Sequence, residues 1–368
     1  MATAAYQPLS DAEVREIASA YFSDRQAKTQ AQNRPTIVLV GGQPGAGKSV
    51  AAAAVRSELA AQGGFIHVDA DRMRERIRIG DSRPPSEQTQ ADAGRLVTSL
   101  RELAMQGRRN MVEEGTFRNA DGAGKFIQSL REQGYRVELV AVATPREESL
   151  LGVYQRHEMQ HAAGSNNPRF IAESYHDDAL QGFDTTVAKT ATQLDRVRVV
   201  NRTGELLYDS NSPRNSQGNA FEALATGRAL SDAKLSALGK AWTAVEAAAA
   251  ARSAPSAYLE AIAGHERRVQ DMQKARIHDH AMTRLNANAA TFARDSRFAQ
   301  HTGNELVKAA YFRGFHEKAA QFHDLVPNFE KFDAKVADRA ALGKLPDMGE
   351  FERPFALLRD RSEVGQSL

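Results

Sequence analysis

The feature that most constrains the fold is an apolar run that enters a glycine-rich turn, VLVGGQPGAGKSV, at residues 38–50. A buried strand, a tight glycine turn and an alanine-rich helix form the setting that a phosphate loop requires, and the eight-residue pattern is complete. A turn that only joins a strand to a helix would explain the glycines, but it would not also require Lys48 and Ser49. The residues of the predicted phosphate-binding loop are Gly42, Gln43, Pro44, Gly45, Ala46, Gly47, Lys48 and Ser49.

In such a loop the backbone N–H groups curl around a phosphate at the positive end of the following helix. Lys48 is expected to reach the β- and γ-phosphate oxygens of a nucleoside triphosphate, and the Ser49 hydroxyl is the expected Mg²⁺ ligand. The loop therefore predicts a phosphate donor, with ATP and Mg²⁺ as the expected pair. It does not identify the acceptor.

Strand and helix patterns alternate around this loop. Apolar strands are expected at 36–40, 65–70, 110–116, 136–145 and 195–209, and helices at 48–63, 95–107, 124–134, 147–160 and 171–192. A leading helix is expected over 10–30, because Ser10 and Glu13 form a capping pattern. Repeated strand–helix units require a mainly parallel sheet that is covered on both faces. The predicted fold class is therefore α/β, a phosphate-loop NTPase or kinase domain.

The pattern changes towards the C-terminus. The stretch YDSNSPRNSQGNA at 208–220 is rich in Ser, Asn, Gly and Pro, which is typical of a linker. Beyond it the strand pattern ends, and the sequence becomes alanine-rich and helical in periodicity. We therefore expect a phosphate-loop domain at 1–212, a linker at 213–220 and an all-α C-terminal region at 221–368.

The composition narrows the class of partner. The net charge is only +2 and neither half of the chain has a large excess of basic residues, so nucleic acid is not an expected partner. The chain has no cysteine, which excludes disulfides and thiolate metal sites. No segment has the roughly eighteen uncharged apolar residues of a membrane span, and the N-terminus lacks the pattern of a secretory signal. A cytoplasmic protein without a membrane partner is expected.

Polar residues stand at the carboxyl ends of the next two strands, where open α/β sheets hold their ligands. In VDADR, Asp69 suits a helix cap, and Asp71 is the candidate base that accepts a proton from an attacking hydroxyl. In EEGTFR, a buried strand is followed by Glu114, Thr116 and Arg118. We interpret these three as acceptor-binding residues, although a solvated strand end would show the same composition.

Two arginines bracket a loop further along the chain. Arg156 lies on an expected helix, and Arg169 follows a stretch that contains glycine and two asparagines. Phosphoryl transfer concentrates negative charge on the transferred group, and arginines delivered from a lid stabilise it. A single surface arginine is usually only solvated, but this pair is expected to act with Lys48 and Asp71 in catalysis.

In this order and at this spacing the motifs resemble those of the zeta toxin family, bacterial kinases of toxin–antitoxin systems that phosphorylate UDP-N-acetylglucosamine and so block cell-wall synthesis. The resemblance covers about residues 10–210 and rests on GGQPGAGKS, VDADR, VEEGTFR, LLGVYQRHE, PRFIAESYHD and VVNRTGELLY. It implies that Asp71 is the base acting on the sugar 3′-hydroxyl and that Arg156 and Arg169 contact the ATP phosphates. Glu114 and Thr116 resemble acceptor-site residues, and Arg118 lies in the same motif.

The chain departs from the family on the acceptor side. The family often has an aromatic residue and then His-Pro after the second strand, where this chain has RMRERIRIGDSRPP. It also lacks the acidic residue that faces the sugar, the nearest acids being Asp92 and Glu102. Two alternatives therefore stay open: a kinase retargeted to NAD or a nucleoside, and a nucleotide-gated binding protein that works through its helical tail. The expected protein partner is a small antitoxin, or the C-terminal region acting as an inhibitor.

Overall fold

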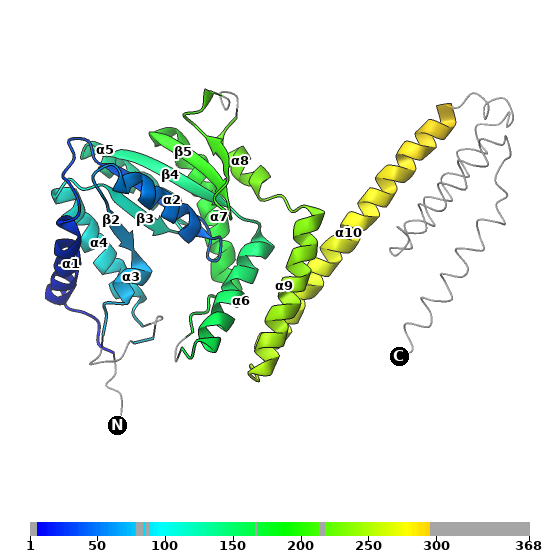
Figure 1. Cartoon of the computed structure of the whole chain (residues 1–368), viewed down its shortest axis with the longest axis horizontal. Helices are drawn as coiled ribbons and strands as arrows, with labels where there is room; N and C mark the ends of the chain where they lie inside the picture. The colour runs from blue at the N-terminus through cyan, green and yellow to red at the C-terminus, as the bar shows by residue number, and fades with distance from the viewer. Residues whose placement is uncertain (1–5, 79–83, 86–87, 166–167, 214–217, 295–368) are drawn as a thin grey trace. The chain divides into compact units, whose positions relative to one another are not determined.

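The computed structural model describes residues 6–78, 84–85, 88–165, 168–213 and 218–294, with side chains described as far as residue 276 (Figure 1). Part of the expected C-terminal region, 295–368, lies outside the described residues. Two compact units are present, Met1–Glu266 and Arg267–Leu368, and the sheet and the phosphate loop belong to the first. Within the described part of the chain, no helix has the length and apolar character needed to cross a membrane.

A six-stranded sheet forms the centre of the first unit, in the order β2-β3-β1-β4-β5-β6. All neighbouring strands are parallel except β6, which runs antiparallel to β5. The strands are β1 (Thr36–Gly41), β2 (Ile66–Asp69), β3 (Met111–Gly115), β4 (Arg136–Ala143), β5 (Arg196–Asn201) and β6 (Leu206–Asp209). The sheet confirms the predicted α/β fold class, and the expected strand at 195–209 is two strands, β5 and β6, joined by a turn at 202–205.

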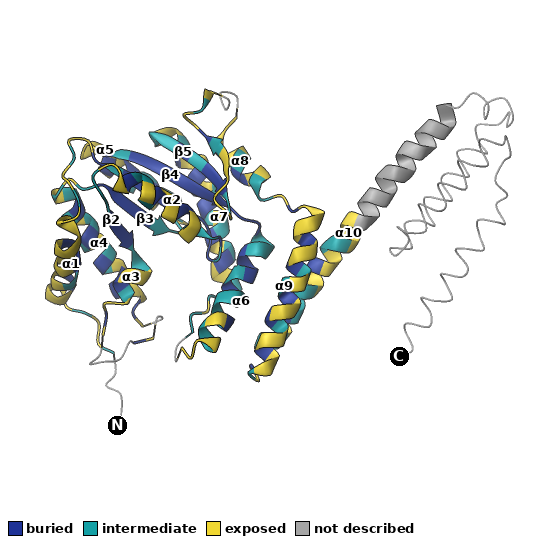
Figure 2. Cartoon of the chain, in the orientation of Figure 1, coloured by how far each residue is buried: buried dark blue, intermediate teal, exposed yellow. Residues whose placement is uncertain are grey.

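β1 and most of β4 are apolar because both faces of the sheet are covered there (Figure 2). Along β1, Ile37 and Leu39 pack into one core and Val38 and Val40 into the other. The first core is shared with α1 (Asp11–Gln26), α4 (Gln90–Gln106), α5 (Ala120–Glu132) and α7 (Glu173–Thr190). The second core is closed by α2 (Lys48–Ala60), the helix that follows the glycine turn.

Helix boundaries follow local signals. The Ser10 and Glu13 side chains form the expected capping box, so α1 begins at Asp11, and it ends at Gln26 rather than near residue 30. Asp69 caps the short helix α3 (Ala70–Arg74). The remaining helices are α6 (Arg146–Ala162), α8 (Ala220–Gly227), α9 (Asp232–Ala251) and α10 (Ser256–Arg294).

The first compact unit continues past the boundary that we expected at residue 212. Ala220 and Leu224 of α8 are buried in the core of the sheet, and α9 packs against α6 with Trp242 only 1% exposed. The linker composition at 213–220 therefore does not coincide with a change of compact unit, because the apolar faces of α8 and α9 are buried on the phosphate-loop domain. The structure places 221–266 with that domain.

Candidate functional site

The glycine turn between β1 and α2 has the backbone that only glycine adopts readily. Gly42, Gly45 and Gly47 have φ values of 154°, 74° and 90°. A Cβ atom at Gly45 would lie 2.0 Å from the Ser149 carbonyl oxygen, so a side chain there would also collide with α6. The loop is thus fixed by both conformation and close packing, as a phosphate-binding turn requires.

The second residue of the loop is a structural anchor. The Gln43 side chain is fully buried, and its Nε2 donates to the Thr144 carbonyl (2.7 Å) and to Ser149 Oγ (3.1 Å). Thr144 in turn donates from Oγ1 to the Ala46 carbonyl (2.7 Å). These bonds tie the loop to the β4–α6 connection, so only the backbone of Gln43 remains a candidate for contact with a phosphate.

Lys48 folds back over the loop that it follows. Its Nζ donates to the carbonyl oxygens of Gly42 (2.8 Å) and Gln43 (3.0 Å). Burial lowers the pKa of the Lys48 ammonium to about 8. The charges close enough to act on that pKa are those of Glu114, Arg156, Arg169 and Asp71. The structure therefore brings five of the residues selected from the sequence into one electrostatic cluster. Ser49 is exposed in the first turn of α2.

The two aspartates after β2 have different surroundings. Asp69 Oδ1 accepts from the backbone N–H groups of Asp71 (2.7 Å) and Arg72 (3.3 Å), which is the capping geometry expected for it. The Asp71 carboxylate is about half exposed and forms ion pairs with Arg169 and Arg74. Burial opposes the charge, but the two arginines hold the pKa of Asp71 below its ordinary value. Asp71 is thus ionised and able to accept a proton.

Arg156 carries unpaired donors. Its Nε and Nη2 are buried and have no hydrogen-bond partner among the described residues. Burial, with Arg169 beside it, lowers the pKa of the Arg156 guanidinium. Buried donors without an acceptor cost stability unless an anion completes them. Arg169 is positioned by its backbone N–H, which donates to Gln160 Oε1 of α6 (2.6 Å). α6 therefore positions both arginines, and both charges act on Lys48.

Glu114 at the end of β3 has two partners that the sequence did not reveal. Its Oε1 accepts from Arg56 Nη1 (3.1 Å) and lies 2.8 Å from His67 Nε2. Burial opposes the charge, but these contacts lower the pKa of Glu114. His67 precedes Asp69 by two residues on β2, so period-two alternation could have indicated that both reach the same face. Arg74 was missed as well, since only its pairing with Asp71 distinguishes it from neighbouring arginines.

His67, Asp69 and Glu114 bring their ligand atoms within 4.8 Å of one another. Such a set could in principle hold a divalent cation. The Arg56 guanidinium already occupies the same Glu114 oxygen, however, and its charge opposes a cation there. We interpret the three residues as a hydrogen-bonded group that orients Glu114.

The remaining acceptor candidates lie on the turn after β3. Thr116 is half-buried, and Arg118 is exposed with its guanidinium 4.6 Å from the centre of the Tyr175 ring on α7. Phe117 between them has a φ of 43°, a strained conformation for a bulky residue. Its carbonyl accepts from Thr186 Oγ1 (2.6 Å), which anchors the turn to α7. The contacts of Arg118 are thus with α7 rather than with the Lys48 cluster.

Asp92 is one of the two acidic residues on α4 that the sequence places nearest to the expected acceptor site, and its carboxylate is hydrogen-bonded to other groups. It accepts from the Tyr6 hydroxyl, from the Leu9 backbone N–H (2.9 Å) and from Arg95 Nη1 (2.7 Å), and it is 2% exposed. These bonds attach the N-terminal segment to α4. Asp92 therefore cannot replace the acidic residue that faces the sugar in the family.

A buried serine and histidine and a partly exposed aspartate form a further chain of contacts. Ser149 Oγ lies 2.8 Å from His176 Nε2, and His176 Nδ1 lies 3.0 Å from Asp177. Ser149 and His176 are completely buried, so no substrate reaches the hydroxyl. Burial lowers the pKa of His176 and keeps the imidazole neutral. The group continues the chain of bonds from Gln43 and supports the phosphate loop; it is not a hydrolytic site.

The family model of the zeta toxin matches residues 19–213, which include the loop, both strand-end motifs and both arginines. The chain belongs to the zeta toxin family. Toxin PezT of Streptococcus pneumoniae is 26% identical over 229 residues, covering 60% of this chain and 90% of that protein. Toxin zeta of Enterococcus hirae is 29% identical over 191 residues, covering 49% of this chain and 65% of that protein.

A solved structure of the PezAT chromosomal toxin–antitoxin system of Streptococcus pneumoniae shares the fold of this zeta toxin family member. The TM-score is 0.55 at 24% identity, with 65% of this chain and 99% of that chain covered. Family membership makes this chain a kinase-like toxin of the toxin–antitoxin class and a phosphotransferase.

Proposed function

We propose that this zeta toxin family member transfers the γ-phosphate of ATP to the 3′-hydroxyl of a UDP-activated amino sugar similar to UDP-N-acetylglucosamine. The observation that carries the proposal is the cluster in which an ionised carboxylate, Asp71, and two arginines share the surroundings of Lys48. A hydroxyl acceptor needs a base within reach, and a transferred phosphoryl group needs positive charge around it. The cluster supplies both.

In the proposed reaction the loop N–H groups and Lys48 hold the donor phosphates. Among the described residues, the Lys48 ammonium donates to two loop carbonyls, which triphosphate oxygens can replace. The N–H groups at Nε and Nη2 of Arg156, which are unpaired among the described residues, donate to oxygens of the γ-phosphoryl group and stabilise its developing negative charge. Asp71 receives the proton of the attacking hydroxyl, while Glu114, Thr116 and Arg118 are the proposed contacts of the sugar nucleotide.

Mg²⁺ fits the exposed hydroxyl of Ser49 at the start of α2, beside the loop. When bound there, it would neutralise charge on the β- and γ-phosphates. A toxin of this kind acts where ATP and sugar nucleotides are made, so we propose action in the bacterial cytoplasm and block of cell-wall synthesis. A small antitoxin is the proposed partner, as the name of the PezAT toxin–antitoxin system suggests for that relative; inhibition by residues of the chain's own C-terminal region is the alternative.

The experiment incubates the full chain with ATP, Mg²⁺ and a panel of UDP-sugars, nucleosides and NAD, and measures by mass spectrometry which compound gains one phosphate. Phosphorus NMR of the product then locates the modified hydroxyl. Asp71→Asn is the matched control, since it keeps the shape of the side chain but cannot act as a base. Transfer only to NAD or to a nucleoside would replace the sugar-nucleotide proposal, and ATP binding without transfer to any acceptor would favour a nucleotide-gated binding protein.

A further inference from the structure

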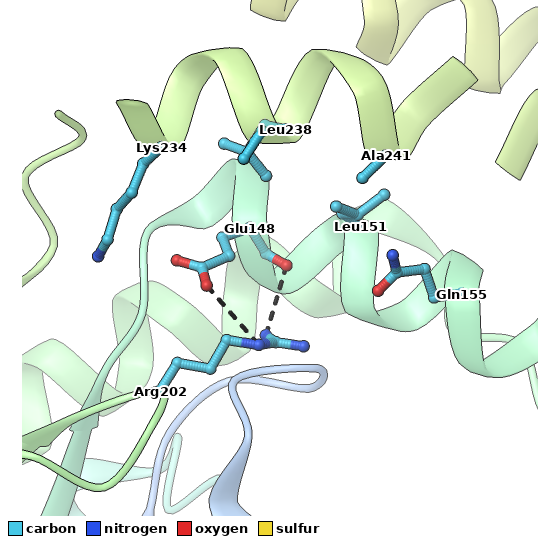
Figure 3. Close-up of a pocket in the computed structure, with 8 residues that line it drawn as sticks. Glu148, Leu151, Gln155, Arg202, Lys234, Leu238 and Ala241 are labelled. Atoms are coloured by element: carbon cyan, nitrogen blue, oxygen red, sulfur yellow. Dashed lines mark hydrogen bonds and ion pairs between the residues drawn. The ribbon is translucent and has the colours of Figure 1, made fainter. Parts of the chain in front are cut away.

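A pocket of about 210 Å³ lies between α6 and α9, and no residue that we place at the transfer site lines it (Figure 3). Sites that hold whole drug-sized ligands measure roughly 300–1,000 Å³, so this pocket suits a small planar group. Its floor is Arg202 from the turn after β5, and its sides come from α6 and α9.

Arg202 joins this pocket to the phosphate loop. Its Nη1 donates to the carbonyl oxygens of Gly45 (2.5 Å) and Glu148 (3.4 Å), and its Nε lies 3.7 Å from the Glu148 carboxylate. These contacts hold the guanidinium of Arg202 at the pocket. A guanidinium plane fixed in this way is a group on which a base can stack.

The walls and rim of the pocket match a heteroaromatic base. Leu151 of α6 faces Leu238 and Ala241 of α9 across the pocket, which gives two apolar sides. Gln155 stands at the rim with an amide that both donates and accepts hydrogen bonds. A purine has apolar faces and a polar edge with donors and acceptors, so it suits the apolar sides and the Gln155 amide. Glu148 and Lys234 add one charge of each sign to the lining.

We propose that this pocket holds the purine base of the donor nucleotide, whose phosphates lie on the neighbouring loop, and that α9 provides one of its walls. The inference rests on the proposed donor role of ATP. Because α9 lies beyond residues 19–213, the family model does not include this wall. The helical segment after the expected linker is then part of the nucleotide site.

Calorimetry on the full chain with Mg²⁺ tests this by comparing a non-hydrolysable ATP analogue with inorganic tripolyphosphate, which has the phosphates but no base. The wild-type chain should bind the analogue about ten- to a hundred-fold more tightly, the usual range for stacking one base. Ala241→Phe fills the pocket and should reduce the preference for the analogue by about tenfold while changing tripolyphosphate affinity less than about twofold. Ala244→Phe, on the exposed side of α9, is the matched control and should change neither.

Gln155→Leu provides a second variant of similar volume, in case the phenylalanine disturbs folding. It should also weaken the analogue and spare tripolyphosphate. The assignment of the base would be overturned if both variants lost affinity for the analogue and for tripolyphosphate to the same extent. It would also be overturned if neither variant lost affinity for the analogue. If the wild-type chain bound the analogue and tripolyphosphate with equal affinity, the base pocket would fail while the donor role survived. If it bound neither, the proposed function would fail and the pocket with it.

Discussion

Replacing Trp242 with alanine tests whether α9 is part of the kinase-like unit. The side chain is 1% exposed, stacks on His265 at 4.8 Å and meets the Tyr154 ring of α6 edge-on at 5.2 Å. Truncating a buried tryptophan costs about 3–5 kcal/mol. A domain has only about 5–15 kcal/mol of stability in total, so the loss would be large.

If α9 and the sheet unfold together, the whole unit loses that free energy. At roughly 2–4 °C per kcal/mol for a unit of this size, the melting temperature should fall by about 6–20 °C. Thermal unfolding followed by circular dichroism measures the shift. Phe221→Ala on α8 is the control, because Phe221 is 43% exposed and surface changes usually stay within about 0.5 kcal/mol.

A different result is expected if α9 is not part of the kinase-like unit. If α9 is a separable tail, as the linker composition predicted, Trp242→Ala would leave the main thermal transition and the kinase activity unchanged. A fragment of residues 1–212 would then be soluble and active. The packing predicts instead that this fragment is unstable, since it would expose Tyr154, which is now 4% exposed against α9 and α10.

Four further outcomes follow from the site. Asp71→Asn should lower kcat by about 10²–10⁴ while the dissociation constant of ATP stays nearly unchanged, and an equal loss of ATP affinity in titrations would contradict the base role. Arg156→Ala should lower kcat far more than it raises KM, with Arg156→Lys recovering only part of the rate because it lacks the planar fork. Removing Arg74 takes away a charge that lowers the pKa of Asp71, so in Arg74→Ala the acid limb of the kcat/KM profile should move to higher pH; an unmoved limb would exclude Asp71 as the titrating group. Lys48 has a pKa of about 8 and should be fully protonated beside bound phosphates, so ATP binding at pH 8 should take up about half a proton. Calorimetry in buffers of different ionisation enthalpy measures this uptake.

The sheet and the phosphate loop were predictable because their signals are local. A continuous apolar strand, glycines at fixed spacing and a following helix leave one arrangement for residues 36–60. The capping box at Ser10 is local too, and it placed the start of α1 correctly. Side chains that meet across strands carry no such signal. The contacts of Glu114 with His67 and Arg56 depend on how β3, β2 and α2 pack, and the contact of Asp71 with Arg169 depends on where the segment after α6 lies.

The difference between the expected boundary at residue 212 and the compact unit Met1–Glu266 has a related cause. Composition shows where the chain is locally polar and rich in turn residues, as at 208–220. It does not show whether the helix that follows packs against the preceding domain. Leu224 and Trp242 read as ordinary apolar helix positions, and only the structure shows that they pack on β5 and α6. The distinction between a linker and a surface loop lies in these contacts.

The pairing of Asp71 with two arginines makes it a weak base, and this is compatible with the proposed chemistry. In a loose phosphoryl-transfer transition state the attacking hydroxyl keeps its proton until bond formation is advanced, so the position of the carboxylate matters more than a high pKa. Arg74 comes from the helix that carries Asp71 and can hold it throughout. Arg169 reaches it from the segment after α6, and the same guanidinium is proposed to contact the donor phosphates. One arginine that touches both the base and the phosphate would fix the acceptor hydroxyl, the carboxylate and the transferred group in a single geometry.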